Sequence, residues 1–443
     1  MPGTKKLDVL LLLWYIALLV SIIGCFRAVT SIALILIIAT GFFKTRVETG
    51  KWFSGRLSHT FLIACTLFYL LQLVGLIITP GGNITRQLQL KSALIFVPLA
   101  VCCCSFVNDK SRKKLMIYFT WFAAVAMLAC IAVAAYNYFV LQLPKDVFFY
   151  HKLVIPLKEH HAVQVSILVF SALLFVLEQT KNGSAFKHIS FNYLLIIFLT
   201  ASLLLLSSKL VIGFTFIIFL YYVFLGIRRG NAKAIVASSL GALLLITIIL
   251  SFQNKISSRF KEITSGDLRL LKQKDFDPGT YFNGLQFRVL QVRFVREILD
   301  EQNAWFTGVN PNMQELLDEK YIETKMYTGD GITEDRGYLG LNTHNQFLES
   351  LLQSGWPGLI AFGLTCLALI RMAFRRKNRE LTITIILLLL YCLNESVFET
   401  QYGLILYTFL PMFLYYGTAR SGQRRRRRKV KLVEITHNNH LHS

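Results

Sequence analysis

Three residues far apart in the chain have side chains suited to group transfer, namely Lys209, Arg288 and His344. Lysine and arginine can neutralise charge on a phosphate leaving group, and an uncharged imidazole can take the proton of an attacking hydroxyl. If they meet, the three side chains suit a diphosphate ligand beside a hydroxyl nucleophile. Each also has a simpler interpretation: a snorkelling lysine, an arginine against lipid headgroups and a structural histidine.

His344 begins the segment HNQFLESLLQSGWPG, in which apolar residues recur at the spacing of an amphipathic helix until Gly355 and Pro357 interrupt it. Thr343 and Gln346 fit a capping box, which predicts that His344 lies in the first turn of this helix. The positive end of the helix dipole disfavours an imidazolium there, and free amide groups favour an anion. The position therefore favours a neutral histidine beside an anionic ligand.

The elements that must position these residues are membrane helices. The chain has 443 residues, of which 54% are hydrophobic and only 16% charged, and its apolar residues form runs of about twenty. Its net charge of +22 comes from short basic clusters between apolar runs, a pattern typical of cytoplasmic loops, so we expect no nucleic-acid partner. Twelve apolar stretches predict an all-α polytopic membrane protein: 8–26, 28–43, 58–79, 89–107, 115–141, 162–178, 189–207, 209–227, 234–252, 355–374, 381–396 and 402–418.

Charge counting predicts the orientation and the domains. Lys5 and Lys6 precede the first stretch without a cleavage site, and basic residues favour the side of both termini, which we therefore place in the cytoplasm. The arginine run 424–428 predicts affinity for anionic phospholipid. The expected divisions are transmembrane helices 1–9 (1–252), one large, mainly helical outer loop (253–343), the amphipathic helix and helices 10–12 (344–418), and a basic cytoplasmic tail (419–443).

This topology gathers ionisable residues on the outer face, where such residues are candidate functional sites. In addition to Lys209 and His344, these ionisable residues are His160, His161, Glu395 and Glu399. In the outer loop, 287–299 has apolar residues at helical spacing with Arg288, Arg293 and Arg296 between them, which predicts a helix with a cationic face. We therefore expect the site at the outer membrane surface.

The eight cysteines all fall within or at the edge of the apolar stretches, so disulfides and cysteine-based metal sites are not expected.

The pattern His344-Asn345, nine residues, Gly355, two residues, Gly358 resembles the signature of the bacterial O-antigen ligase superfamily. Three further segments are similar to that family: the Arg288 region with the turn 305–308, the outer turn 207–209, and the acidic patch 394–403. Lys209 stands where the family has an arginine, so that a bidentate phosphate contact becomes a point charge. Val292 and Asn310 also depart from the pattern, which places the chain in a divergent branch.

The resemblance implies a GT-C-like, metal-independent, inverting glycosyltransferase without a cofactor, at the periplasmic face of the bacterial inner membrane. It implies a donor glycan on undecaprenyl diphosphate and an acceptor hydroxyl on lipid A–core in lipopolysaccharide biosynthesis. His344 would activate the acceptor, while Arg288 and Lys209 would hold the diphosphate. The implied substrate-binding residues are His160, His161, Asn345, Arg293, Glu395 and Glu399. The outer loop would cover the site, where Tyr321, Tyr327 and Tyr338 could stack on sugars or simply be surface residues.

Two alternatives remain open. A polysaccharide polymerase of the same superfamily would share the mechanism and use another lipid-linked glycan as acceptor. A transporter or flippase would instead need ionisable residues near mid-membrane and broken helices at matching places in two halves. The candidates cluster at one surface and the large loop has no counterpart in the first half, which argues against a transporter. The Gly355/Gly358 form of the signature resembles that of the ligases and favours the ligase over the polymerase.

Overall fold

A computed structural model describes residues 2–78, 84–158, 160–182, 189–251, 273–277, 280, 282–326 and 337–417. Within these ranges all regular structure is helical. The basic tail, Tyr327 and much of the first part of the outer loop lie outside the described residues. The helices that match the predicted apolar stretches are α1 (Pro2–Gly24), α2 (Arg27–Thr49), α3 (Thr60–Ile78), α5 (Ala93–Cys102), α6 (Asp109–Phe139), α8 (Ala162–Asn182), α9 (Ile189–Leu206), α10 (Lys209–Arg229), α11 (Ala232–Ser251), α15 (Gln346–Arg376), α16 (Arg379–Asn394) and α17 (Gln401–Gly417).

The helical class is confirmed, and so in part is the membrane prediction. Among the described residues, six helices are long and apolar enough to cross a membrane: α1, α2, α6, α8, α10 and α15. The other six stretches form shorter helices. α16, for example, has 16 residues, which gives a length of about 24 Å against a hydrocarbon core of about 30 Å. Short helices and turns connect them: η1 (Gly55–Ser58), α4 (Ile84–Lys91), η2 (Lys145–Phe148), α7 (Tyr150–Leu153), η3 (Ile155–Leu157) and η5 (Val397–Glu399).

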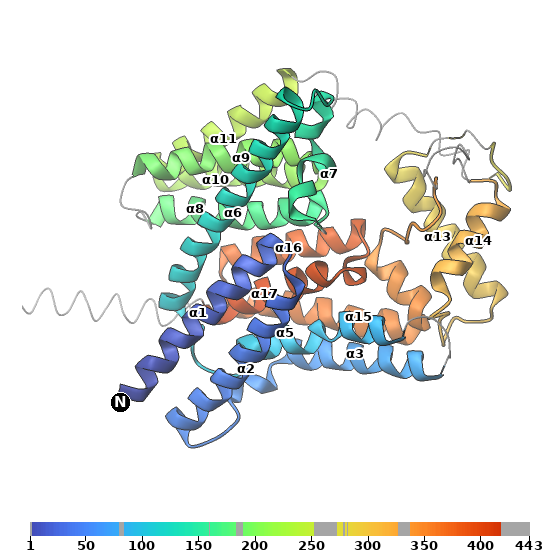
Figure 1. The fold of residues 1–443 in the computed structure, drawn as a ribbon, viewed down its shortest axis with the longest axis horizontal. Helices are drawn as coiled ribbons and strands as arrows, with labels where there is room; N and C mark the ends of the chain where they lie inside the picture. The colour runs from blue at the N-terminus through green and yellow to red at the C-terminus, as the bar shows by residue number, and fades with distance from the viewer. Residues whose placement is uncertain are drawn as a thin grey trace, which may run out of the picture.

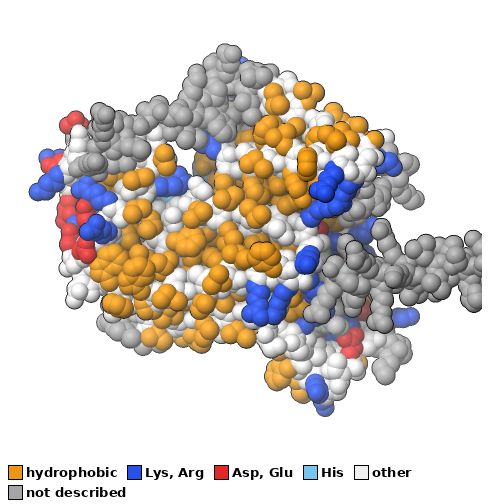
Figure 2. Space-filling model, turned by 180° about the vertical axis from the view of Figure 1, so that it is seen from behind, with side chains coloured by type: hydrophobic (Ala, Val, Ile, Leu, Met, Phe, Trp, Pro, Cys, Tyr) orange, Lys and Arg blue, Asp and Glu red, His pale blue; other side chains and the backbone are white. Residues whose placement is uncertain are grey.

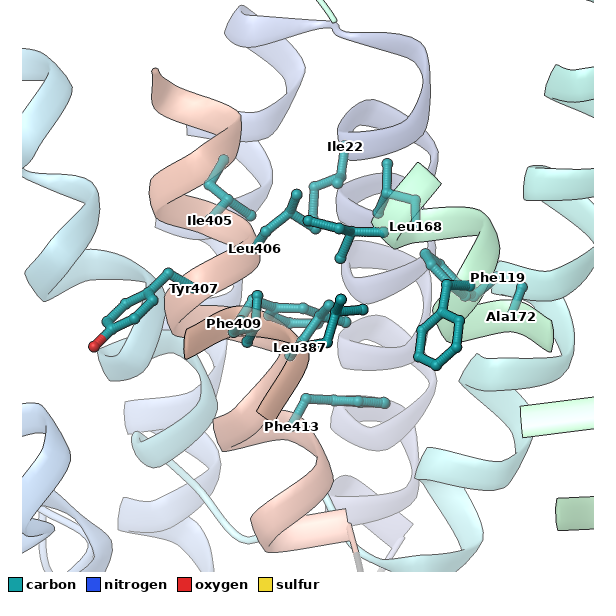
Figure 3. Close-up of a cluster of buried hydrophobic side chains, with 14 of the residues drawn as sticks. Ile22, Phe119, Leu168, Ala172, Leu387, Ile405, Leu406, Tyr407, Phe409 and Phe413 are labelled. Atoms are coloured by element: carbon teal, nitrogen blue, oxygen red, sulfur yellow. The ribbon is translucent and has the colours of Figure 1, made fainter. Parts of the chain in front are cut away.

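The bundle is apolar inside and outside. α8 and α17 are buried almost along their whole length and form its centre, where α17 packs with α1, α6 and α8 around Phe119, Leu168 and Phe409 (Figure 3). The outer helices leave large apolar side chains such as Leu128 and Leu367 exposed, and apolar side chains cover much of the face in Figure 2. So large an apolar surface is typical of contact with lipid or another protein.

All eight cysteines are buried and free of disulfides, as predicted. The triplet Cys102–Cys104 packs closely enough against α2 that a methyl group on Gly41 would lie 2.3 Å from the Cys103 sulfur.

A second, smaller core belongs to the outer loop. α13 (Gly284–Glu301) and α14 (Met313–Glu323) pack together at one end of the bundle, beside the first half of α15 (Figure 1). Phe294 and Leu317 are fully buried between them, and Leu352 of α15 joins the same cluster. The cationic helix predicted around Arg288 is thus α13, and its apolar face holds the loop to the helix that follows His344.

α15 is broken where the sequence predicts an interruption. Ser354 and Gly355 have non-helical backbone angles, and Gly355 has a φ of 61°. The first segment of the helix therefore runs from Gln346 to the break, and the apolar membrane segment follows it. This break separates the part of α15 that carries polar residues from its longer, apolar part.

Candidate active site

His344, Glu395 and Arg288 meet at the junction of the outer loop with α15 and α16. His344 Nδ1 lies 3.0 Å from Glu395 Oε2, and Arg288 Nη2 lies 3.8 Å from Glu395 Oε1. The three side chains are 29%, 28% and 31% exposed, so each is accessible from outside the bundle. We call these three residues the outer cluster. It brings together an imidazole, a carboxylate that can orient it and a guanidinium.

His344 lies just before α15 and not in its first turn, so the predicted capping box is wrong. Asn345 is the N-cap, and its side-chain oxygen accepts hydrogen bonds from the amides of Phe347 and Leu348. Asparagine is a stronger N-cap than threonine, which explains why the helix starts two residues later. These two amides are paired with Asn345, so they are not the free donors that the sequence predicted for an anion beside His344.

The backbone around His344 is fixed in an uncommon conformation. His344 has a φ of 47°, in the left-handed region that few non-glycine residues adopt. Its amide donates to Asn342 Oδ1 at 3.0 Å, and its ring lies edge-on to Phe287 of α13 at 5.5 Å between centroids. The imidazole is therefore held by its own backbone turn, by α13 and by Glu395.

Arg288 joins α13 to the end of α16. Its Nη2 donates to the Asn394 carbonyl at 2.8 Å, and its Nη1 donates to the Gly284 carbonyl at 2.7 Å. α13 starts at a capping box in which Asn283 caps the helix and Gln286 bonds back, and this fixes the turn that carries Arg288. The guanidinium is thus pre-positioned beside Glu395 and remains about one-third exposed.

Lys209 is the first residue of α10 and is partly exposed. α10 packs against α16, and Tyr222 near the far end of α10 lies close to Arg379 and Glu380 at the start of α16. The two helices therefore run antiparallel, which places Lys209 at the same end of the bundle as Glu395. The two contacts that define the outer cluster, His344–Glu395 and Arg288–Glu395, do not involve Lys209.

Of the two histidines before α8, one is buried and the other is exposed. His160 is buried, its Nε2 lies 2.7 Å from the Ile22 carbonyl, and its ring packs on Tyr402. His161 is exposed, and its carbonyl accepts the first amide bonds of α8. His160 is 4% exposed and bonded to a carbonyl, so it offers little surface to a ligand, and its predicted role in substrate binding stays a prediction.

Three other predicted substrate-binding residues have partners within the protein. Arg293 bonds to Glu297, one helical turn further along α13, at 2.7 Å. Asn345 caps α15, and its side-chain amide donates to the Leu393 carbonyl. Glu399 accepts a bond of 2.7 Å from Gln353. They hold the segments around the outer cluster together.

The described outer-loop tyrosines are parts of its core. Tyr321 is fully buried, its hydroxyl donates to the Leu341 carbonyl at 3.0 Å, and burial raises its pKa. Tyr338 stacks on Phe287, and its hydroxyl accepts the Phe282 amide. Tyr321 is therefore neither free to stack on a sugar nor a surface residue, contrary to both interpretations that the sequence left open.

The glycines of the signature allow two turns to pack backbone against backbone. A methyl group on Gly308 would lie 2.3 Å from the Gln353 carbonyl carbon, and one on Gly355 would lie 2.4 Å from the Trp305 carbonyl oxygen. The Val309 amide donates to the Leu352 carbonyl across this contact. The 305–308 turn is thus docked on the break in α15, and through it the outer loop is held in place.

The first segment of α15 carries a buried polar stripe that was not predicted from the sequence. Gln346, Glu349, Ser350 and Gln353 recur at helical spacing, and all are at most 3% exposed. In a helix of this kind the polar face is expected to be solvated, but here it faces the loop 395–399 and the bundle. The helical spacing of these polar residues can be seen in the sequence, but their burial cannot.

The polar stripe ends on a buried lysine. Lys91 Nζ, at the end of α4, donates to Gln353 Oε1 at 2.9 Å and to Gln72 Oε1 at 3.1 Å. The amide of Gln353 in turn donates to Glu399 and Glu349. A buried lysine and two acidic side chains are therefore joined through one amide group, which satisfies groups that would be costly to bury alone.

Among the described residues, no three histidine, cysteine, aspartate or glutamate side chains are grouped as metal ligands would be. No protein-family model matches the chain, and no curated protein is detectably similar to it in sequence.

Proposed function

We propose that this protein is an O-antigen ligase-type glycosyltransferase. It moves a glycan from undecaprenyl diphosphate to an acceptor hydroxyl of lipid A–core on the periplasmic face of the inner membrane. The observation that carries the proposal is the 3.0 Å contact between His344 Nδ1 and Glu395, with the Arg288 guanidinium against the same carboxylate. The proposed architecture is GT-C-like, with twelve spans and both termini in the cytoplasm.

The outer cluster suits acid–base catalysis at an anionic leaving group. Glu395 fixes Nδ1 of His344 as the protonated nitrogen, which leaves Nε2 to take the acceptor's proton. The acceptor oxygen then bonds to the anomeric carbon as the bond from that carbon to the diphosphate oxygen breaks. The electron pair leaves with the diphosphate, and the anomeric centre inverts.

Two cations support the departing diphosphate in this mechanism. Arg288 lies beside His344 and keeps part of its guanidinium exposed, so it can contact phosphate oxygens while its other donors stay on Asn394 and Gly284. Lys209, at the same end of the bundle, adds a point charge. Glu395 stabilises the imidazolium that forms, and the proton on His344 then passes to the diphosphate or to solvent.

The test is transfer in liposomes that hold the purified protein, an undecaprenyl-diphosphate-linked glycan and either lipid A–core or a second lipid-linked glycan. Glycan on lipid A–core supports the ligase, whereas extended lipid-linked glycan indicates a polymerase of the same mechanism. Loss of the parent's activity with a chelator would contradict a metal-independent reaction. Transfer to neither acceptor would contradict the proposal, and uptake of the donor without transfer would point to a transporter.

A further inference from the structure

One oxygen of a buried glutamate bonds to both segments that carry the candidate catalytic pair. Thr343 Oγ1 donates to Glu349 Oε2 at 2.6 Å, and Ser396 Oγ donates to the same oxygen at 3.0 Å. Thr343 directly precedes His344, and Ser396 directly follows Glu395. The two hydroxyls also lie 3.2 Å from each other. Glu349 thus joins the two chain segments one residue away from their contact.

Glu349, Thr343 and Ser396 are shielded from any ligand. Glu349 and Thr343 are fully buried and Ser396 is 5% exposed, whereas His344 and Glu395 are each nearly one-third exposed. A group this buried cannot touch a substrate of the outer cluster. It can act only by fixing the positions of the residues on either side of it.

The rest of the 395–399 loop is fixed by the same helix and by the core. The Phe398 amide donates to Gln346 Oε1 at 2.7 Å, and the Phe398 ring packs edge-on with Tyr407 and Phe362. Gln353, held by Lys91, bonds to Glu399 at the end of the loop. Among the residues through which the 395–399 loop bonds to α15, Ser396 is therefore the nearest in the chain to Glu395. Its partner Glu349 also bonds to Thr343, next to His344.

We propose that Glu349, Thr343 and Ser396 form a clamp that positions His344 and Glu395 for proton transfer. They are positioning residues, because they touch neither reacting group. The expected effect on the transfer rate rests on the proposed function, whereas the positioning of the two side chains does not. Small displacements of a catalytic pair are costly, about 100-fold in rate for about 1 Å.

The kinetic test compares shape-matched variants. Thr343→Val removes the hydroxyl and keeps the shape, whereas Thr343→Ser keeps the hydroxyl. We expect Thr343→Val and Ser396→Ala to lower kcat by about 10- to 100-fold with little change in the donor KM, and Thr343→Ser to stay near the parent. The control is Ser350→Ala, since Ser350 is equally buried on the same helix face but bonds only to Gln346 in the described contacts.

The geometric test needs no transfer activity. In a His344→Cys/Glu395→Cys double variant, a short bis-methanethiosulfonate should cross-link the two positions, and the buried native cysteines should not compete. Adding Thr343→Val should slow this cross-linking several-fold, and adding Ser350→Ala should not. Parent-like cross-linking in Thr343→Val, or equal slowing by Ser350→Ala, would overturn the clamp. If the parent transfers no glycan, the proposed function fails and cross-linking alone decides on the clamp.

Discussion

At the residue scale, the outer cluster depends on which nitrogen of His344 meets Glu395. The carboxylate lies at Nδ1 and Arg288 lies against its other oxygen, so one acidic side chain links the base to the cation. The sequence identified all three residues as candidates, but it assigned Glu395 only to substrate binding. It could not show the pairing, because 51 positions separate His344 from Glu395 and only the fold brings them together.

Glu395→Gln should preserve the fold and lower the transfer rate. The amide can still contact the imidazole but no longer stabilises its charged form, so we expect a loss of about 100-fold or more in kcat. Glu297→Gln is the control, because Glu297 pairs only with Arg293 in the described contacts. Steady-state transfer rates check this, and equal rates for the two variants would show that Glu395 does not assist His344.

Lys209 departs from the arginine of the resembled family, and this departure can be tested directly. Lys209→Arg should keep or raise transfer, because a guanidinium offers a bidentate contact to phosphate, while Lys209→Ala should lower it by about tenfold or more. The measurement is kcat/KM for the lipid-linked donor. A Lys209→Ala variant with parental kcat/KM would remove Lys209 from the mechanism.

At the element scale, two features of α15 position the site, and the sequence predicted one of them. Its break at Gly355 was expected from the glycine and proline there, since these residues disrupt helices by a local mechanism. The start of α15 was predicted two residues early because Thr343 and Asn345 both qualify as caps. The buried polar stripe was missed because burial depends on tertiary packing, here against the 395–399 loop.

Gly308→Ala should destabilise the docked turn more than Gly340→Ala. Both glycines have positive φ, of 70° and 80°, but only a methyl group on Gly308 would meet backbone atoms. We expect Gly340→Ala to cost about 1–2 kcal/mol and Gly308→Ala about 2–5 kcal/mol of unfolding free energy. Thermal unfolding in detergent measures the difference. Equal midpoints would mean that the contact between 305–308 and the α15 break contributes no stability.

At the scale of the whole molecule, every one of the twelve predicted apolar stretches contains a helix, and six helices reach spanning length and composition among the described residues. Hydrophobic periodicity and run length are local properties, so the sequence was sufficient to predict them. The junction where the outer loop meets α15 and α16 was only partly predictable. It depends on glycine contacts and buried hydrogen bonds between distant segments.

The predicted orientation can be tested with single cysteines. Arg296→Cys lies on α13 at a position 77% exposed, and Lys51→Cys lies at an exposed position after α2. A membrane-impermeant maleimide applied to spheroplasts should label Arg296→Cys and not Lys51→Cys, because the proposed orientation places only the first on the periplasmic side. The buried native cysteines give little background. Labelling of Lys51→Cys alone would mean that the topology is inverted and that the outer cluster faces the cytoplasm.

The central claim is that His344 and Arg288 together transfer a lipid-linked glycan. The most direct measurement is single-turnover transfer from an undecaprenyl-diphosphate-linked glycan by the parent and by His344→Ala and Arg288→Ala. The matched controls are His151→Ala, an exposed histidine of α7, and Arg296→Ala, an exposed arginine of the same helix as Arg288. We predict losses of about 100- to 10,000-fold for the two site variants and parental rates for the controls. Parental rates in His344→Ala and Arg288→Ala would contradict the account.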